Sequence, residues 1–492
     1  MLVLINDYKR IVFILLQFKI KNMKLTGNAI QYSVEQLFAR ALPNLATPRM
    51  IARDANWVTF ALPDGGNITF GLLEDTELQL FIHGDLSSSL ISTADGKEQL
   101  PVFKSAYKSI QDFEYKEDID TLFIPYDIIS PTFFFLSREE EYHDVLRDRF
   151  NRFLYSASLA CRYHCIQLPI VDEYAMLLRK WILQYLRPQL EIQSRTAQLI
   201  PTHDIDLLNR FHTPWQSFRS ILGRDLLIDH SFSTMSKSIS EYNQYKKDIK
   251  NDPYIVAIQE LIEQSRKVGL QSRFFFKSLS EEDSDHSYLI SDPNVRYCID
   301  KIQEAGMFVG LHGSFESYNN IEKFSTEKQR LEKIADVPID SCRQHYLRFN
   351  LARNLQGEPL DVSQALATSR TPEFNLTTTL QVWRSCGIKH DYTLGYAEQP
   401  GFRCGTCHPY PLYDIENDIA TNIIEHPLMV MDGSLFDYMK LSEEDGYTLV
   451  SQLYRRCKAV EGDFIILWHN HVLGRQFSSY YQKIYLRLLQ NQ

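Results

Sequence analysis

An apolar run that ends in two aspartates constrains this chain more than any other feature. Residues 197–201 are largely apolar, and Thr202 and His203 lead from them to Asp204 and Asp206. A buried strand that delivers carboxylates to its end requires partners for them, because unpaired aspartate is rarely buried. Residues two apart on a strand face the same side, so Asp204 and Asp206 can share one site. If Thr202 instead opens a turn, this geometry fails.

Composition excludes several classes of protein. A chain of 492 residues is long enough for two or three domains. The net charge of -10 argues against nucleic acid as a main partner. Eight cysteines are too few for a disulfide scaffold, so we expect most of them to be reduced. The apolar run at 11–16 is too short to span a bilayer, so we expect no transmembrane segment and a cytoplasmic protein.

The first part of the chain, residues 1–190, is predicted to be a smaller α/β domain of unknown role. The polar stretch around 187–197 contains Pro188 and reads as a linker. Apolar patterning predicts strands at 2–5, 57–61, 78–82 and 121–125, and helices at about 139–159 and 173–186.

Residues 195–492 alternate strand-like and helical segments. The strand predictions are 197–200, 272–276, 307–311, 346–349, 388–394, 426–431 and 464–468. Helices are predicted at 253–268 and 293–305, each opened by Asp-Pro, which suits an N-cap followed by proline. Seven strands separated by helices favour a parallel (β/α) barrel, with a helical insertion at about 211–251.

Polar clusters follow several of these strands, where a parallel α/β protein gathers its active residues. Together they suit metal-assisted hydrolysis. Asp206 and His312 can supply metal ligands, Asp204 can act as the base and His469 as the acid. Further clusters hold Arg343 and Arg403, either of which can orient a carboxylate.

The order of these motifs resembles the polysaccharide deacetylase family, which carries the NodB-homology domain of carbohydrate esterase family 4. The resemblance covers residues 195–492, and the stretches at 133–142 and 167–172 resemble the amino-terminal region that accompanies this domain in bacterial deacetylase-like proteins. It implies a distorted β/α barrel that uses a divalent metal to remove N-acetyl or O-acetyl groups from sugar polymers.

Site roles follow from the resemblance residue by residue. Asp204 matches the catalytic base, and Asp206 matches the metal carboxylate, with one residue between them where many members have adjacent aspartates. His312 matches the first metal histidine, Arg343 the arginine that orients the base, and His469 the catalytic histidine of the last motif.

Two positions depart from the family pattern. Glu316 stands where the second metal histidine is usual, four residues after His312, and His345 stands where proline is usual. Glutamate is an acceptable zinc ligand and residues four apart on a helical turn can share an ion, so Glu316 is a candidate third ligand. The alternative is a solvated helix residue. The expected cofactor is a divalent metal, zinc first, with cobalt or nickel as alternatives.

Three other interpretations compete with a deacetylase. Cys404, Cys407 and His408 match the haem-attachment spacing, but their Gly/Pro-rich loop is better interpreted as lining the pocket. Asp204 and Asp206 also form the Asp-x-Asp of metal-dependent glycosyltransferases, although residues 1–190 lack a Gly-rich phosphate loop. The third alternative is an inactive barrel that binds glycan or a partner protein.

The leading expectation is a hydrolase acting on non-peptide carbon–nitrogen bonds, with an acetylated saccharide from bacterial surface-polysaccharide metabolism as substrate.

Overall fold

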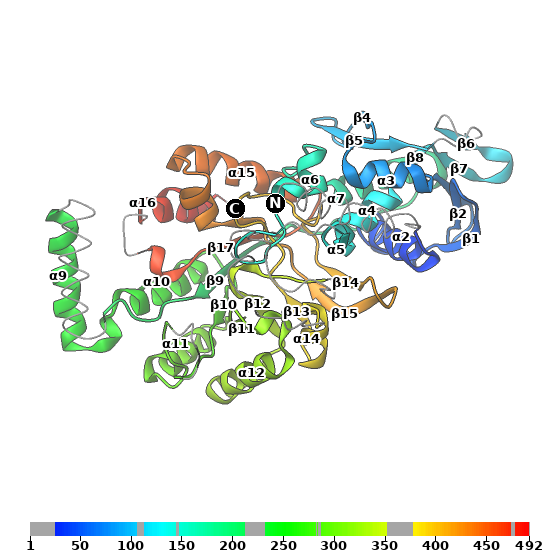
Figure 1. The fold of residues 1–492 in the computed structure, drawn as a ribbon. Coiled ribbons are helices and arrows are strands. Elements are labelled where there is room, and N and C mark those ends of the chain that lie inside the picture. Colours follow the sequence, from blue (N-terminus) through cyan, green and yellow to red (C-terminus); the bar gives the residue numbers. More distant parts are fainter. Residues whose placement is uncertain are drawn as a thin grey trace, which may run out of the picture.

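The computed structural model describes residues 25–105, 113–143, 147–211, 232–281, 283, 287–351, 377–473 and 478–491. Two groups of strands separate along the sequence, one in the N-terminal part (residues 25–186) and one in the C-terminal part (residues 199–491) (Figure 1). The strand predicted at 2–5 and the sequence of 212–231 in the insertion lie outside the described residues.

The N-terminal part contains two small sheets. The larger has the order β1-β2-β3-β7-β6, in which only β3 and β7 are parallel, and the smaller has the order β4-β5-β8. The strands are β1 (Arg49–Arg53), β2 (Trp57–Ala61), β3 (Asn67–Gly71), β4 (Ser89–Ser92), β5 (Gln99–Lys104), β6 (Glu114–Lys116), β7 (Thr121–Ile124) and β8 (Tyr126–Asp127). The helices are α2 (Gly27–Ala41), α3 (Asp75–His83), α4 (Ile129–Ser137), α5 (Glu139–His143), α6 (Leu159–Arg162) and α7 (Ile170–Trp181).

Two predictions for this part were wrong. Residues 78–82 are helical, within α3, because Glu74 and Glu77 form a capping box and Gly84 ends the helix with φ of 77°. Residues 139–159 are not one helix: α5 ends at His143, and Arg147 pairs with Phe153 in a β-bridge.

The C-terminal part is built on a nine-stranded sheet with the order β14-β15-β13-β12-β11-β10-β9-β17-β16. All neighbours are parallel except β14 and β15. The strands are β9 (Leu199–Ile205), β10 (Arg273–Phe276), β11 (Phe308–Gly313), β12 (Ser341–Gln344), β13 (His390–Asp391), β14 (Tyr410–Asp414), β15 (Ile419–Glu425), β16 (Val430–Met431) and β17 (Phe464–Leu467).

The predicted barrel is not closed among the described strands. After β15 the chain crosses from one half of the sheet to the other. A single backbone hydrogen bond links it to each half there: the Leu428 N–H donates to the Leu394 carbonyl at 3.1 Å, and the Met429 N–H donates to the Ile465 carbonyl at 3.2 Å. These isolated bonds do not form a strand ladder, so β14 and β16 remain edges of an open parallel sheet. The prediction of a parallel α/β architecture holds, but closure into a barrel does not.

Helices cover the outer side of this sheet (Figure 1). Helix α10 (Pro253–Lys267) begins after the Asp252 cap and α11 (Pro293–Glu304) after the Asp292 cap, as predicted. The other helices are α9 (Phe232–Lys247), which lies in the predicted insertion, α12 (Ile321–Ala335), α14 (Thr379–Ser385), α15 (Glu443–Ala459), α16 (Ser478–Tyr480) and α17 (Arg487–Gln490). None of the described helices has the length and apolar character that a bilayer crossing requires.

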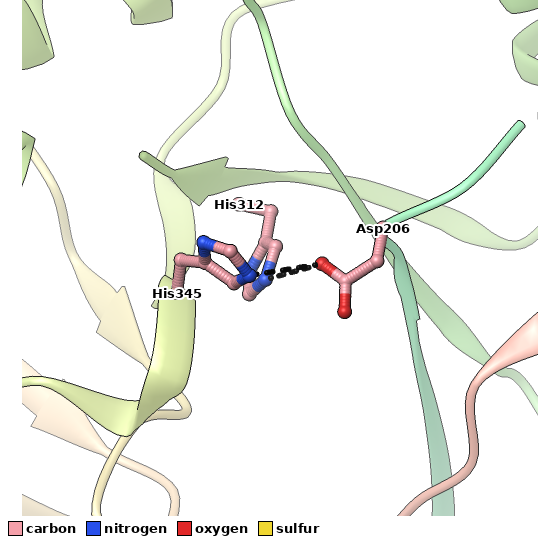
Figure 2. Close-up of side chains that lie close together, drawn as sticks. All are labelled: Asp206, His312 and His345. Carbon is pink, nitrogen blue, oxygen red and sulfur yellow. Dashed lines mark ion pairs between the residues drawn. The ribbon is translucent and has the colours of Figure 1, made fainter. Parts of the chain in front are cut away.

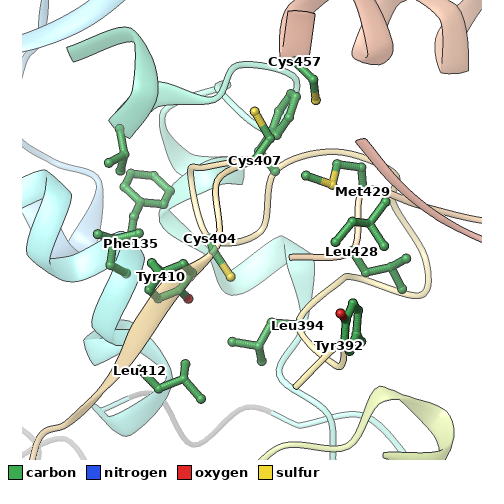
Figure 3. Packing of buried hydrophobic residues seen from close by; sticks show 14 of the residues in the cluster. Phe135, Tyr392, Leu394, Cys404, Cys407, Tyr410, Leu412, Leu428, Met429 and Cys457 are labelled. Carbon is green, nitrogen blue, oxygen red and sulfur yellow. The ribbon is translucent and has the colours of Figure 1, made fainter. Parts of the chain in front are cut away.

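The two parts share one buried core. Figure 3 shows Phe135 of α4 near Cys404, Cys407 and Tyr410 of the C-terminal part. Asp172 of α7 also accepts hydrogen bonds from the Thr406 hydroxyl at 2.6 Å and the Cys407 N–H at 2.8 Å. The N-terminal part is therefore packed firmly against the loop at 401–408.

Candidate metal centre and surrounding pocket

Strand β9 carries Asp204 and Asp206 to the edge of the sheet. The strand is buried because it lies between β10 and β17, and it extends five residues beyond the predicted end at Ile200. Asp204 is its penultimate residue and Asp206 follows it directly. Both carboxylates line one cavity of about 520 Å³.

Asp206 meets two histidines from neighbouring strands (Figure 2). Its Oδ1 atom lies 3.3 Å from Nε2 of His312, in β11, and 3.4 Å from Nε2 of His345, which follows β12. The three potential ligand atoms all lie within 4.8 Å of one another. One carboxylate and two imidazoles on adjacent strand ends make a candidate metal centre.

The donor set fits a divalent ion. The Nδ1 atom of His312 lies 2.9 Å from the carbonyl oxygen of Arg343. Because a carbonyl can only accept, Nδ1 carries a proton and Nε2 is the atom that faces Asp206. The buried Oδ1 of Asp206 has no hydrogen-bond donor among the described residues. One carboxylate oxygen facing the Nε2 atoms of two imidazoles is a donor set that zinc, cobalt or nickel binds well once the imidazoles are neutral.

Cationic groups keep Asp206 ionised. Burial raises the pKa of this carboxyl, but His345, His312 and Lys277 together outweigh burial and hold its pKa well below the usual range. Lys277, directly after β10, places its Nζ atom 3.6 Å from Oδ1 of Asp206. The site therefore presents a carboxylate, the form that a metal requires, across the neutral pH range.

Glu316 does not join this group. Its side chain is 59% exposed and pairs with Lys323 at 2.8 Å. His312 and Glu316 could share an ion only if a regular helical turn joined them. Instead β11 runs to Gly313, and a single 3₁₀ turn follows at Ser317–Asn319. The solvated alternative therefore describes Glu316, and His345 occupies the third position.

A second carboxylate, Asp204, lies beside the metal candidates and is held by an arginine. Nη1 of Arg343 donates to Oδ1 of Asp204 at 3.0 Å and to the Thr202 hydroxyl at 2.8 Å. Its Nε donates to the carbonyl of Tyr392 at 2.8 Å, so the fully buried guanidinium is fixed at both ends. The other Asp204 oxygen, Oδ2, is 3.8 Å from Nε2 of His312. Arg343 thus orients Asp204 toward the candidate ligands.

His469 lies on the other side of Asp206. Its Nε2 atom is 3.5 Å from Oδ2 of Asp206, and its Nδ1 atom is 2.8 Å from the buried carboxylate of Asp432. Burial lowers the pKa of His469, but Asp432, followed by Asp206 and Asp204, overrides burial and raises it to about 10. His469 is therefore protonated at neutral pH, as a general acid must be.

Arg403 does not reach the cavity. It is buried and donates to both carboxylate oxygens of Glu141, at distances of 2.8 to 3.0 Å. The loop around it packs on the N-terminal part: a Cβ on Gly401, which has φ of 142°, would overlap the Ile166 carbonyl. No residue from 401 to 408 lines the cavity, so the prediction that this loop lines the pocket was wrong. Cys404 and Cys407 are buried, and burial raises the pKa of both thiols.

Four residues of this region were missed as site residues by the sequence argument. Asp432 directly follows Val430 and Met431, the same apolar-then-aspartate signal that singled out Asp204. His345 was noted only as a departure from a family pattern. Lys277 directly follows the apolar run 274–276 and carries a similar signal. Arg152 carries no local signal, since its position depends on packing between distant segments.

Comparisons with known proteins give one family match and two distant structural matches. A family of unknown function, DUF7033, matches residues 18–187. No curated protein matches the chain. Two solved structures each overlap 60% of this chain. One is an assigned polysaccharide deacetylase from Mycobacterium smegmatis, with 15% identity, 85% of that chain covered and a TM-score of 0.35. The other is an assigned polysaccharide deacetylase involved in O-antigen biosynthesis from Bordetella bronchiseptica, with 11% identity, 91% of that chain covered and a TM-score of 0.27. At such scores the functional conclusion depends on the side-chain geometry.

Proposed function

We propose that this protein is a metal-dependent hydrolase that removes acetyl groups from an N- or O-acetylated saccharide in bacterial surface-polysaccharide metabolism. The observation that carries the proposal is the convergence of Asp206, His312 and His345 between an arginine-held Asp204 and an aspartate-held His469. This is a three-ligand centre with a base on one side and an acid on the other.

Each side chain has a distinct role in this proposal. A divalent ion held by Asp206, His312 and His345 would polarise an acetyl carbonyl and acidify a water molecule. Asp204 accepts a proton from the attacking water while Arg343 fixes its carboxylate. His469 donates a proton from Nε2 to the departing amine or alcohol, and Asp432 holds its Nδ1.

The same contacts favour hydrolysis over glycosyl transfer. In an Asp-x-Asp transferase the two aspartates hold a metal and a nucleotide-sugar. Here Arg343 donates directly to Asp204, and Asp206 faces two imidazoles. This arrangement gives His312 and His469 functions that a transferase would leave unassigned.

Acetate release from N-acetylated and O-acetylated oligosaccharides tests the proposal. We expect Asp204→Asn and His469→Ala each to lower turnover by about 10²- to 10⁴-fold while the fold survives. Asp340→Asn is a matched control, because Asp340 pairs with Lys389 and lies outside the cavity. Full activity in both site variants would contradict the assigned roles. Wild-type protein that neither binds zinc, cobalt or nickel nor releases acetate would instead support an inactive, glycan-binding protein.

A further inference from the structure

A tight turn of the N-terminal part, residues 147–153, reaches the cavity described above. Arg147 and Phe153 form its antiparallel bridge. Within it, the Asp148 N–H donates to the Arg152 carbonyl at 3.0 Å and the Asn151 N–H donates to the Asp148 carbonyl at 2.9 Å. Asn151 adopts a left-handed φ of 59°, a conformation that asparagine tolerates. The 147–153 turn is therefore internally well ordered.

Asp148 fixes the direction of Arg152. Its carboxylate accepts from the backbone N–H groups of Phe150 and Arg152, each at 2.9 Å. The same carboxylate accepts from Nε of Arg152 at 2.7 Å. On the other side of the guanidinium, Nη1 donates to the Tyr346 carbonyl at 3.4 Å, so the plane of the group is fixed.

The turn is also anchored on the C-terminal part. Asn151 donates from Nδ2 to the Tyr318 hydroxyl at 3.0 Å. The ring of Phe150 stacks on that of Tyr346 with centroids 4.5 Å apart and planes 15° apart. Tyr346 immediately follows His345, so the turn sits beside the candidate metal centre rather than on a remote surface.

Arg152 itself forms part of the cavity wall. It is 8% exposed, and its Nη2 atom donates to the Tyr438 hydroxyl at 3.2 Å. Of the described residues that line the cavity, Arg152 is the only arginine or lysine, and Tyr346, Phe436 and Tyr438 add aromatic surface. Fixed N–H donors beside aromatic rings suit a sugar, which offers hydroxyl groups and an apolar face.

We propose that the N-terminal part completes the substrate site, and that Arg152 binds the sugar unit next to the acetylated one. The substrate is then an oligosaccharide or polysaccharide rather than a free monosaccharide. Because Asp148 already neutralises the guanidinium, the group bound by Arg152 is a neutral hydroxyl rather than an anion. This inference rests on the proposed deacetylase function and assigns a role to a region that matches a family of unknown function.

Steady-state kinetics of the full, zinc-loaded chain test the inference. The probes are N-acetylchitotetraose, N-acetylglucosamine and 4-nitrophenyl acetate, the last requiring only the reacting centre. We expect wild type to prefer the tetrasaccharide to the monosaccharide. Arg152→Ala should raise KM for the tetrasaccharide by about 10- to 100-fold, the loss expected for one charged hydrogen bond. Arg152→Lys should restore part of the loss.

The matched control is Arg149→Ala. Arg149 belongs to the same turn and is exposed, and its guanidinium lies 4.6 Å from the centroid of the Phe150 ring. It should leave KM unchanged. Equal KM in wild type and Arg152→Ala would overturn this inference, and so would the absence of any preference for the tetrasaccharide. If 4-nitrophenyl acetate is still hydrolysed in that case, the proposed function stands. Loss of bound zinc in Arg152→Ala would assign the residue a structural role and also overturn it. If the wild-type protein turns over none of the three probes, the proposed function itself is contradicted.

Discussion

Nδ1 of His469 lies 2.8 Å from Oδ1 of Asp432, and the His469 N–H donates to Oδ2 of the same carboxylate at 2.7 Å. The two residues follow β17 and β16, which are parallel and in register through Met431 and Leu467. One fully buried carboxylate therefore holds both the backbone and the ring of His469. This arrangement fixes the orientation of the ring so that Nε2 faces the cavity.

Asp432→Asn should weaken the proposed acid function of His469. The amide preserves the shape of the side chain but removes the charge that most strongly raises the His469 pKa. A histidine acts as an acid only below its pKa, so the basic limb of the pH–rate profile should move to lower pH. We also expect turnover to fall by about 10- to 100-fold. Rates measured from pH 6 to 11 test this, with Asp437→Asn as the control in the same cavity. An unmoved basic limb would contradict the pairing.

Metal binding distinguishes His345 from Glu316. We expect wild type to bind about one zinc, cobalt or nickel ion per chain. His345→Ala and Asp206→Ala should lower the affinity by about 100-fold or more, because each removes a candidate ligand. Glu316→Ala should bind as wild type, since Glu316 is exposed and pairs with Lys323. Calorimetric titration measures all four proteins. Loss of metal in the Glu316 variant alone would restore Glu316 as a ligand.

Local patterns in the sequence predicted much of the fold but less of the site. The apolar run before Asp204 predicted β9, and the Asp-Pro pairs predicted the starts of α10 and α11. These features depend on neighbours within a few residues. Asp204, Asp206, His312 and His469, which line one cavity, could be singled out because each comes at or just beyond the end of an apolar strand.

The third candidate ligand depends on structure that local patterns do not encode. The apolar residues at 346–349 suggested a strand, but Tyr346 and Leu347 both have left-handed φ values, of 59° and 57°, and strand β12 ends before them at Gln344. The register that pairs Gly313 with Gln344 then brings His345 beside His312. Strand register across 30 residues of intervening chain is set by packing, so the choice between Glu316 and His345 required the structure.

Arg403 should matter for stability rather than for catalysis. Its buried ion pair with Glu141 joins the two parts of the protein, and Glu141 also accepts from Nε of Arg138 at 2.7 Å. Arg403→Met leaves Glu141 short of a partner, so we expect a loss of about 3–5 kcal/mol in the free energy of unfolding. Denaturant titration measures it. The control is Arg384→Met, where a half-exposed pair with Asp414 should cost no more than about 1 kcal/mol. An Arg403 variant of normal stability that has lost activity would return Arg403 to the active site.

Glu173 should make the protein less stable as pH rises. This residue of α7 is buried, and burial, followed by the charges of Asp95 and Asp172, raises its pKa from 4.5 to about 7. Below about pH 4.5 the carboxyl is protonated in both the folded and unfolded states and has no effect. Between pH 4.5 and 7 the unfolded state loses its proton first, so the free energy of unfolding falls, by about 3 kcal/mol. Glu173→Gln should remove this loss: it should be more stable than wild type at pH 8 and no more stable at pH 4.5. Denaturant titrations of both proteins at the two pH values measure the difference, and an equal stability change at both would contradict a raised pKa for Glu173.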